Sequence, residues 1–240
     1  CGDFIFNVGY FQSALNTPAA NSSTIIPSGG SLNIAATNTN GNANYNLKAN
    51  GVSINAVANT ASYTFNHTDI MANQSYELEI TQGAVTQVKY FVAIVNPSTV
   101  LQALPSATLV DGINYNPSDA TTATLVIDAP LKDFIYVAGS FNNWQPGASY
   151  AMKKDPSSTK FWLELTGLTA GVSYTYQYWV VDTTPIAGSP SLVKTADPFS
   201  TLTLNNYDDP EIKTLGVYPN LPEYPAGQDR DVTVVQTGTN

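Results

Sequence analysis

Trp144 is the residue whose type and position in this sequence best suit ligand binding. It directly follows Asn142 and Asn143, which supply turn chemistry after the Gly139-Ser140 bend. Upstream, residues 135–137 are β-branched or aromatic without a polar break, which predicts a buried strand. We therefore expect Trp144 at a strand exit with its indole partly exposed, where the apolar face of a sugar ring can stack on it. A second interpretation stays open, because a Trp after a turn can also cap the edge of a core.

The segment at residues 173–181 predicts another strand, with two different faces. Its tyrosine-rich face is the better candidate for the core, so Gln177 and Trp179 are expected to point outward and to join Trp144 in one platform. The other interpretation is that both faces are covered, one by its own core and the other by a neighbouring domain. The two alternating sets are Tyr174, Tyr176, Tyr178 and Val180, and Thr175, Gln177 and Trp179.

Residues 139–144, Gly-Ser-Phe-Asn-Asn-Trp, resemble the signature of the early-set, immunoglobulin-like domains of carbohydrate-binding module family 48. Further pieces follow in the order of that family: strands at 160–165 and 174–180, then Ala-Asp-Pro-Phe at 196–199, which resembles the Asp-Pro element that closes such domains. Domains of this family bind starch or glycogen, or precede the catalytic barrel of α-amylase-family glycoside hydrolases. The resemblance therefore implies an α-glucan partner.

The resemblance also implies roles for single residues. In binding members the tryptophan of the motif stacks on glucose, which implies that role for Trp144. We expect hydrogen bonds to the sugar from Asn142 and Asn143 beside it. A lysine that hydrogen-bonds the sugar in those members is matched here by Gln177, which keeps donors and acceptors without the charge. Their second stacking tryptophan has no counterpart before the Asp-Pro element, and Trp179 on the adjacent strand is our candidate replacement.

The residue inventory argues against catalysis by this chain. A nucleophilic triad or dyad would have to use His67, the single histidine, or Cys1, the single cysteine. We expect His67 in a polar loop after a strand. Glycoside hydrolysis needs two carboxylates facing each other across a sugar, and no motif singles out such a pair among eighteen acidic residues. No segment shows the helical period of an α-amylase barrel. We thus expect this chain to be non-catalytic, and the resemblance implies that it is part of an α-amylase-family enzyme.

Oxygen ligands suited to calcium gather in one short stretch, but we expect no cofactor. Their spacing matches no calcium loop, so a solvated loop is the favoured interpretation. Scarce His and Cys exclude imidazole or thiolate metal clusters. The residues concerned are Asn205, Asn206, Asp208, Asp209 and Glu211.

Composition excludes one class of partner. The formal net charge is −9, and such an acidic surface repels phosphate backbones, so nucleic acid is not expected. Neutral glycans remain suitable, because they are bound by aromatic faces and hydrogen bonds rather than by charge.

Cys1 is expected to carry a lipid. Bacterial lipoproteins begin at a cysteine once the signal peptide is removed, and Gly2-Asp3 resembles the short acidic export signal of surface lipoproteins of Bacteroidetes. No run is long enough to span a bilayer, so a membrane would be met through this anchor. This predicts a lipoprotein of the bacterial outer membrane at the cell surface, with secretion as the alternative.

Short alternating segments broken by Gly, Asn, Ser and Pro predict an all-β protein of two tandem immunoglobulin-like antiparallel β-sandwiches. The Pro in Asn96-Pro97 cannot continue a ladder, which sets the boundary. Asn40-Gly41 and Asn50-Gly51 predict hairpins. Strands of the first sandwich are expected at 4–11, 31–36, 43–49, 62–65, 75–81 and 85–94. The domains are 1–97, 98–209 and an extended Pro-rich connector toward a catalytic barrel at 210–240.

Three functional hypotheses follow. The first is the N-terminal, α-glucan-binding or positioning part of a surface-anchored α-amylase, with a catalytic barrel as its partner. The second is a stand-alone glycan-binding lipoprotein of an outer-membrane starch-uptake complex. The third is a structural spacer that binds no sugar.

Overall fold

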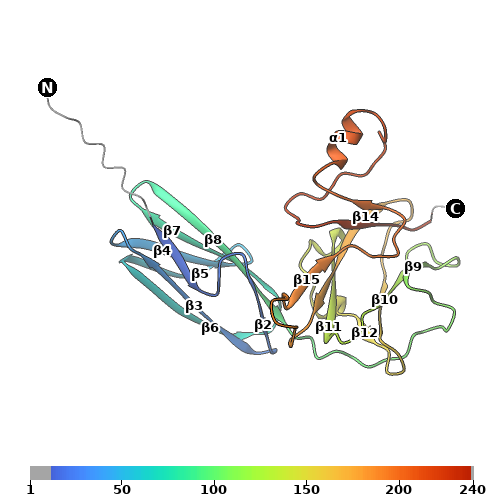
Figure 1. The fold of residues 1–240 in the computed structure, drawn as a ribbon, viewed down its shortest axis with the longest axis horizontal. Coiled ribbons are helices and arrows are strands. Elements are labelled where there is room, and N and C mark those ends of the chain that lie inside the picture. Colours follow the sequence, from blue (N-terminus) through green and yellow to red (C-terminus); the bar gives the residue numbers. More distant parts are fainter. Residues whose placement is uncertain (1–11, 239–240) are drawn as a thin grey trace. The chain divides into compact units, whose positions relative to one another are not determined.

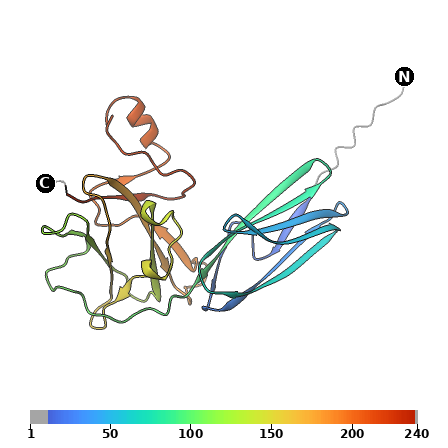
Figure 2. The same cartoon turned by 180° about the vertical axis from the view of Figure 1, so that it is seen from behind.

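The computed structural model describes residues 12–238, which divide between Asn96 and Pro97 into two compact units (Figures 1 and 2). Each unit consists of two β-sheets, which is the all-β tandem architecture predicted from the sequence. Cys1 and the strand expected at 4–11 lie outside the described residues. Among those described, no helix is both long and apolar enough to cross a membrane.

The first unit packs a three-stranded sheet, in the order β1-β3-β6, against a five-stranded sheet, in the order β2-β8-β7-β4-β5. Strands β2 and β8 run parallel, whereas the other pairs of this unit run antiparallel. The bounds are β1 Ser13–Thr17, β2 Ser23–Ile26, β3 Gly30–Asn38, β4 Ala43–Ala49, β5 Val52–Thr60, β6 Ser62–Ile70, β7 Gln74–Gln82 and β8 Val85–Val95.

The core of the first unit follows the alternation of its strands. In the strand expected at 75–81, Tyr76, Leu78 and Ile80 alternate with polar residues, and this period-two spacing predicts from the sequence that they face the core. All three are fully buried in β7, so this prediction is confirmed. Tyr76 stacks on Phe91 of β8 with ring centroids 4.9 Å apart. Offset aromatic pairs of this kind add to the stability gained from buried area.

Of the two predicted Asn-Gly hairpins, the second forms and the first does not. Asn50 and Gly51, with φ of 48° and 79°, join β4 to its neighbour β5. Asn40-Gly41 instead connects β3 to β4, which belong to opposite sheets. The hairpin prediction at Asn40-Gly41 is wrong because such a turn reverses the chain without deciding which sheet the next strand joins.

The second unit packs a four-stranded sheet, in the order β12-β13-β10-β9, against a five-stranded sheet centred on β14. One edge of β14 pairs with β11; its other edge pairs first with β17 and then with β15, while β16 pairs with β17. The bounds are β9 Gly112–Tyr115, β10 Ala123–Asp128, β11 Phe134–Gly139, the 3₁₀ helices η1 Ser140–Asn142 and η2 Ala148–Tyr150, β12 Lys153–Lys154, β13 Lys160–Leu165, β14 Ser173–Val181, β15 Leu192–Thr195, β16 Thr203–Leu204, helix α1 Asp209–Thr214 and β17 Val232–Gln236.

The second sandwich does not end at Asp209, where the sequence places its end. Helix α1, which the sequence does not predict, projects from the sheets (Figure 1). Residues 215–231, here called the strap, then lead without regular structure to β17. Because β17 pairs with both β14 and β16, and Val232 and Val235 are fully buried, the predicted connector returns to complete the sandwich.

Candidate functional site

The sequence motif at 139–144 forms a tightly bonded exit turn from β11. The Asn142 side chain fixes this turn: its Oδ1 accepts a hydrogen bond from the Gly139 N–H, and its Nδ2 donates to the Val137 carbonyl, both at 2.9 Å. Asn143 and Trp144 follow with left-handed φ of 53° and 59°, and the Trp144 N–H donates to the Gly139 carbonyl at 2.9 Å. Both polar groups of Asn142 are therefore bonded within the turn, whereas Asn143 is exposed.

Gly139 is required by close packing rather than by its φ. A Cβ at this position would lie 2.6 Å from the Thr175 carbonyl oxygen and 2.7 Å from Cζ of Phe141. Phe141 in turn stacks on Tyr150, with ring centroids 5.5 Å apart. The glycine of the motif thus lets η1 pack directly against β14.

Trp144 is half-buried at the end of this turn. Its side chain packs against a small apolar cluster that Leu204, Val232 and Val234 form, and Leu221 and Tyr224 of the strap pack against the same cluster. One part of the indole therefore covers apolar neighbours while the remainder stays accessible to solvent. Both interpretations of Trp144, as a stacking residue and as a cap, are compatible with this geometry.

Gln177 and Trp179 do not point outward to solvent, and that prediction is wrong. Gln177 has no exposed surface and Trp179 is 8% exposed. The Gln177 Nε2 donates to three consecutive carbonyls of the strap, at residues 229–231, over 2.5–3.2 Å. Lys194 Nζ lies 5.0 Å from the centroid of the Trp179 ring and pairs with Asp229 at 2.6 Å. Both faces of β14 are thus covered, the outer one by a segment of the same unit.

The strap covers this face without satisfying all of its polar atoms. Oε1 of Gln177 and Nε1 of Trp179 are buried without a hydrogen-bond partner among the described residues. A buried polar group left in this state costs about 1–3 kcal/mol. The outer face of β14 is therefore closed less favourably than its core face.

Asp197, in the Asp-Pro-Phe element, has a structural role. The residue is 2% exposed, and Oδ2 of its carboxylate accepts hydrogen bonds from the hydroxyls of Tyr176 at 2.9 Å and Tyr178 at 3.0 Å. Oδ1 accepts from the Phe199 N–H at 2.8 Å. Burial, followed by the charge of Asp197, raises the pKa of Tyr178 well above its ordinary value. The tyrosine hydroxyls therefore stay protonated and keep donating to Asp197.

The remaining candidate residues have structural partners. His67 lies within β6, not in a loop after a strand as expected, and its Nδ1 is 2.7 Å from the Tyr76 hydroxyl. In the oxygen-rich stretch at 205–211, where a solvated loop was favoured over calcium binding, the Asn205 N–H donates to Asp209 and its Nδ2 to Asp231, at 2.6 and 2.5 Å. Residues 12–238 contain no group of three His, Cys, Asp or Glu side chains placed to hold a metal ion.

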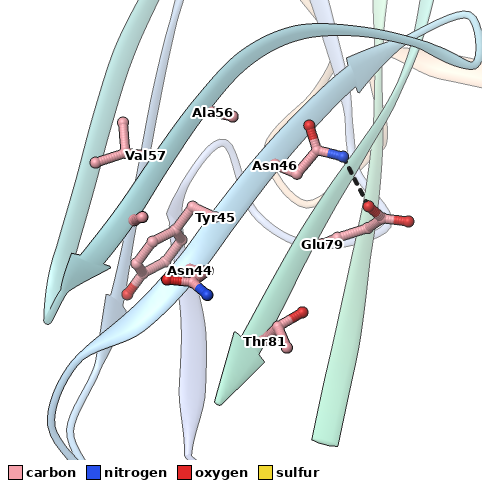
Figure 3. A pocket seen from close by; sticks show the side chains of 8 residues that line it. Asn44, Tyr45, Asn46, Ala56, Val57, Glu79 and Thr81 are labelled. Carbon is pink, nitrogen blue, oxygen red and sulfur yellow. Dashed lines mark hydrogen bonds between the residues drawn. The ribbon is translucent and has the colours of Figure 1, made fainter. Parts of the chain in front are cut away.

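A shallow groove of about 310 Å³ on the first unit was not foreseen from the sequence (Figure 3). It forms where small β5 residues, Ala56 and Ala58, lie beside polar side chains of β4 and β7. Glu79 on its wall accepts hydrogen bonds from Asn46 at 2.8 Å and from Lys48 at 2.6 Å. The one aromatic ring in its lining, that of Tyr45, is buried and offers no face to a ligand, so we assign no ligand to this groove.

The strand pairing of each unit defines an immunoglobulin-like β-sandwich. Comparison with protein-family models finds no match, and comparison with curated proteins finds none either. Among solved structures, the chain is similar to fibronectin(III)-like modules of Clostridium thermocellum CbhA, with 15% identity, 76% of this chain and 92% of that chain covered, and a TM-score of 0.31.

Two further matches are similarly distant. A chimeric titin Z1Z2 tandem is 12% identical, with 75% of this chain and 97% of that chain covered and a TM-score of 0.30. Klebsiella pneumoniae pullulanase complexed with maltotriose is 11% identical, with 71% of this chain and 19% of that chain covered and a TM-score of 0.32. Matches at these identities and TM-scores carry no argument about the function of this chain.

Proposed function

We propose that the second unit is a non-catalytic module that binds or positions an α-glucan, with Trp144 as its stacking residue. The observation that supports this most directly is the exit turn of β11, in which Asn142 bonds only to backbone groups. A turn held in this way presents the partly exposed indole of Trp144 in a fixed orientation. The sequence resemblance at residues 139–144 supplies the class of ligand.

Binding in this proposal rests on few residues. The apolar face of a glucose ring stacks on the accessible part of the Trp144 indole, where dispersion and exclusion of water favour contact. Asn143 is the exposed amide of the turn and is placed to hydrogen-bond a sugar hydroxyl. Asn142 and Gln177 support the site indirectly, because their amides bond to the turn and to the strap.

The described residues form β-sandwiches and no catalytic barrel. We therefore propose that the module serves a glycoside hydrolase of the α-amylase family whose catalytic domain is a separate part. Attachment to the bacterial outer membrane through Cys1 belongs to the same proposal and stays a prediction.

The burial of Gln177 favours a second candidate function, that of a structural spacer. A residue placed to contact sugar would keep donors free, whereas the Gln177 Nε2 is bonded to three strap carbonyls. In the spacer function the outer face of β14 serves only to seat the strap, and neither Trp144 nor Trp179 meets a ligand.

Isothermal titration of the full chain with maltoheptaose separates the two functions. We expect binding that Trp144→Ala weakens by at least about tenfold, as for a central aromatic contact. Leu221→Ala is the matched control, since it removes another side chain packed on the same cluster but keeps the indole. Absence of binding by the unmodified chain would reject the glucan module in favour of the spacer.

A further inference from the structure

A small groove lies between α1 and the strap, in a region for which the sequence predicted no ligand other than the unfavoured calcium site. Its volume is about 170 Å³, below the roughly 300 Å³ at which pockets for drug-sized ligands begin, so it fits one ring rather than an oligosaccharide. Both polar and apolar side chains line it, among them Asn206, Asp209, Lys213, Pro222, Glu223 and Tyr224.

Tyr224 links this groove to Trp144. Its ring packs on the apolar cluster of Leu204, Val232 and Val234, which also carries Trp144. Its hydroxyl donates to the Arg230 carbonyl at 2.6 Å, which fixes the ring at the base of the strap. Trp144 and Tyr224, which lines the groove, therefore pack against one shared apolar cluster.

The lining groups select the chemical class of the ligand. Asp209 and Glu223 supply acceptors, Lys213 supplies donors and pairs with Glu223, and Asn206 supplies both. Two carboxylates against one ammonium disfavour an anion such as a phosphate. Neutral vicinal hydroxyls, in contrast, can donate to the carboxylates and accept from the lysine. The apolar surfaces of Pro222 and Tyr224 suit the face of a pyranose ring.

We propose that this groove is a second sugar subsite, which holds one neutral pyranose unit of the same chain whose other unit stacks on Trp144. This inference rests on the proposed glucan binding and adds a second point of contact. Two subsites joined by one ligand bind more tightly than either subsite alone, because engagement of the second is intramolecular.

The test is titration of the full chain with maltoheptaose after Glu223→Gln, with Glu211→Gln as the matched control. Both glutamates are exposed and close to each other in the sequence, but only Glu223 lines the groove. We expect Glu223→Gln to weaken binding about fivefold, as for one charge-assisted hydrogen bond, and Glu211→Gln to leave it unchanged. The rate of tryptic cleavage after Arg230 should be the same in both variants, which would show that the strap stays seated.

Two results would overturn the second subsite, and they are distinguishable. If binding depends on Trp144 but the two glutamine variants bind equally well, the groove is not a subsite and the proposed glucan binding stands. If the unmodified chain does not bind maltoheptaose, the glucan module and the subsite both fail.

Discussion

The two units build similar sandwiches with different interiors. In the first, the core is almost wholly apolar and aromatic, and Asn38 is the buried polar residue that the structure describes there. The second buries several polar side chains, including Thr175, Gln177, Asp197 and Thr233. Asp197 reaches Tyr176 and Tyr178 across about twenty residues of sequence, and Gln177 reaches the strap across about fifty. The first core thus follows from the local alternation of apolar and polar residues, whereas the second is also stabilised by hydrogen bonds between polar residues far apart in the sequence.

The largest expected effect comes from Asp197→Ala. It leaves the buried hydroxyls of Tyr176 and Tyr178 without an acceptor, so we expect the free energy of unfolding of the second unit to fall by about 4 kcal/mol. Tryptophan fluorescence during urea unfolding reports this directly, because all three tryptophans lie in the second unit. Asp128→Ala, which removes an exposed carboxylate of the same unit, should cost less than 1 kcal/mol, as surface changes do. Equal losses in the two variants would contradict a buried network.

An intermediate effect is expected from Gln177→Met. The variant removes the donor to three strap carbonyls but also removes the unpaired Oε1, so its net cost is about 1 kcal/mol. The strap should nevertheless open more often, and tryptic cleavage after Arg230 should accelerate about tenfold. Gln145→Met, at an exposed glutamine near the same sheet, should leave the cleavage rate unchanged. An unaltered rate in Gln177→Met would show that the amide does not hold the strap.

The smallest effect belongs to the first unit and depends on pH. Hydrogen bonds from Lys48 and then Asn46 hold the pKa of Glu79 below its ordinary value of 4.5. A lowered folded-state pKa stabilises the unit above pH 4.5, and that contribution is lost as pH falls through the folded-state value. Hydrogen exchange of β4 and β7 amides, corrected for intrinsic rates, should show this loss in the unmodified chain and not in Glu79→Gln. A loss of the same size in both would assign the acid sensitivity to another group.

The contrast between local alternation in the first unit and long-range contacts in the second also determines what could be predicted from the sequence. The alternation of Tyr76, Leu78 and Ile80 shows in the residue order, so these three core positions of β7 were predicted correctly. Alternation also identified the core face of β14, through Tyr176 and Tyr178. It could not show what covers the other face, because the partners of Gln177 lie about fifty residues away in a Pro-rich segment without periodicity.

The candidate site was predicted only in part, because some of its contacts are local in the sequence and others are not. The turn chemistry at Asn142 and Asn143 is local, and its place at the exit of β11 was correctly expected. The position of β17 in the middle of a sheet depends on pairing with β14 across more than fifty residues. Only a signal that links such distant segments would have revealed the strap and the groove beside α1.

The late position of β17 also orders events during synthesis. Domains generally fold from the N-terminus as the chain leaves the ribosome, and the strands described for the first unit are complete once Val95 has emerged. The second unit must wait for Gln236, because β17 supplies both the partner of β14 and the residues on which Trp144 packs. Its partly built sheet therefore exposes an unpaired edge until translation has passed this strand. An unpaired edge can pair with other chains, so we expect chaperones to be needed most in this nascent state.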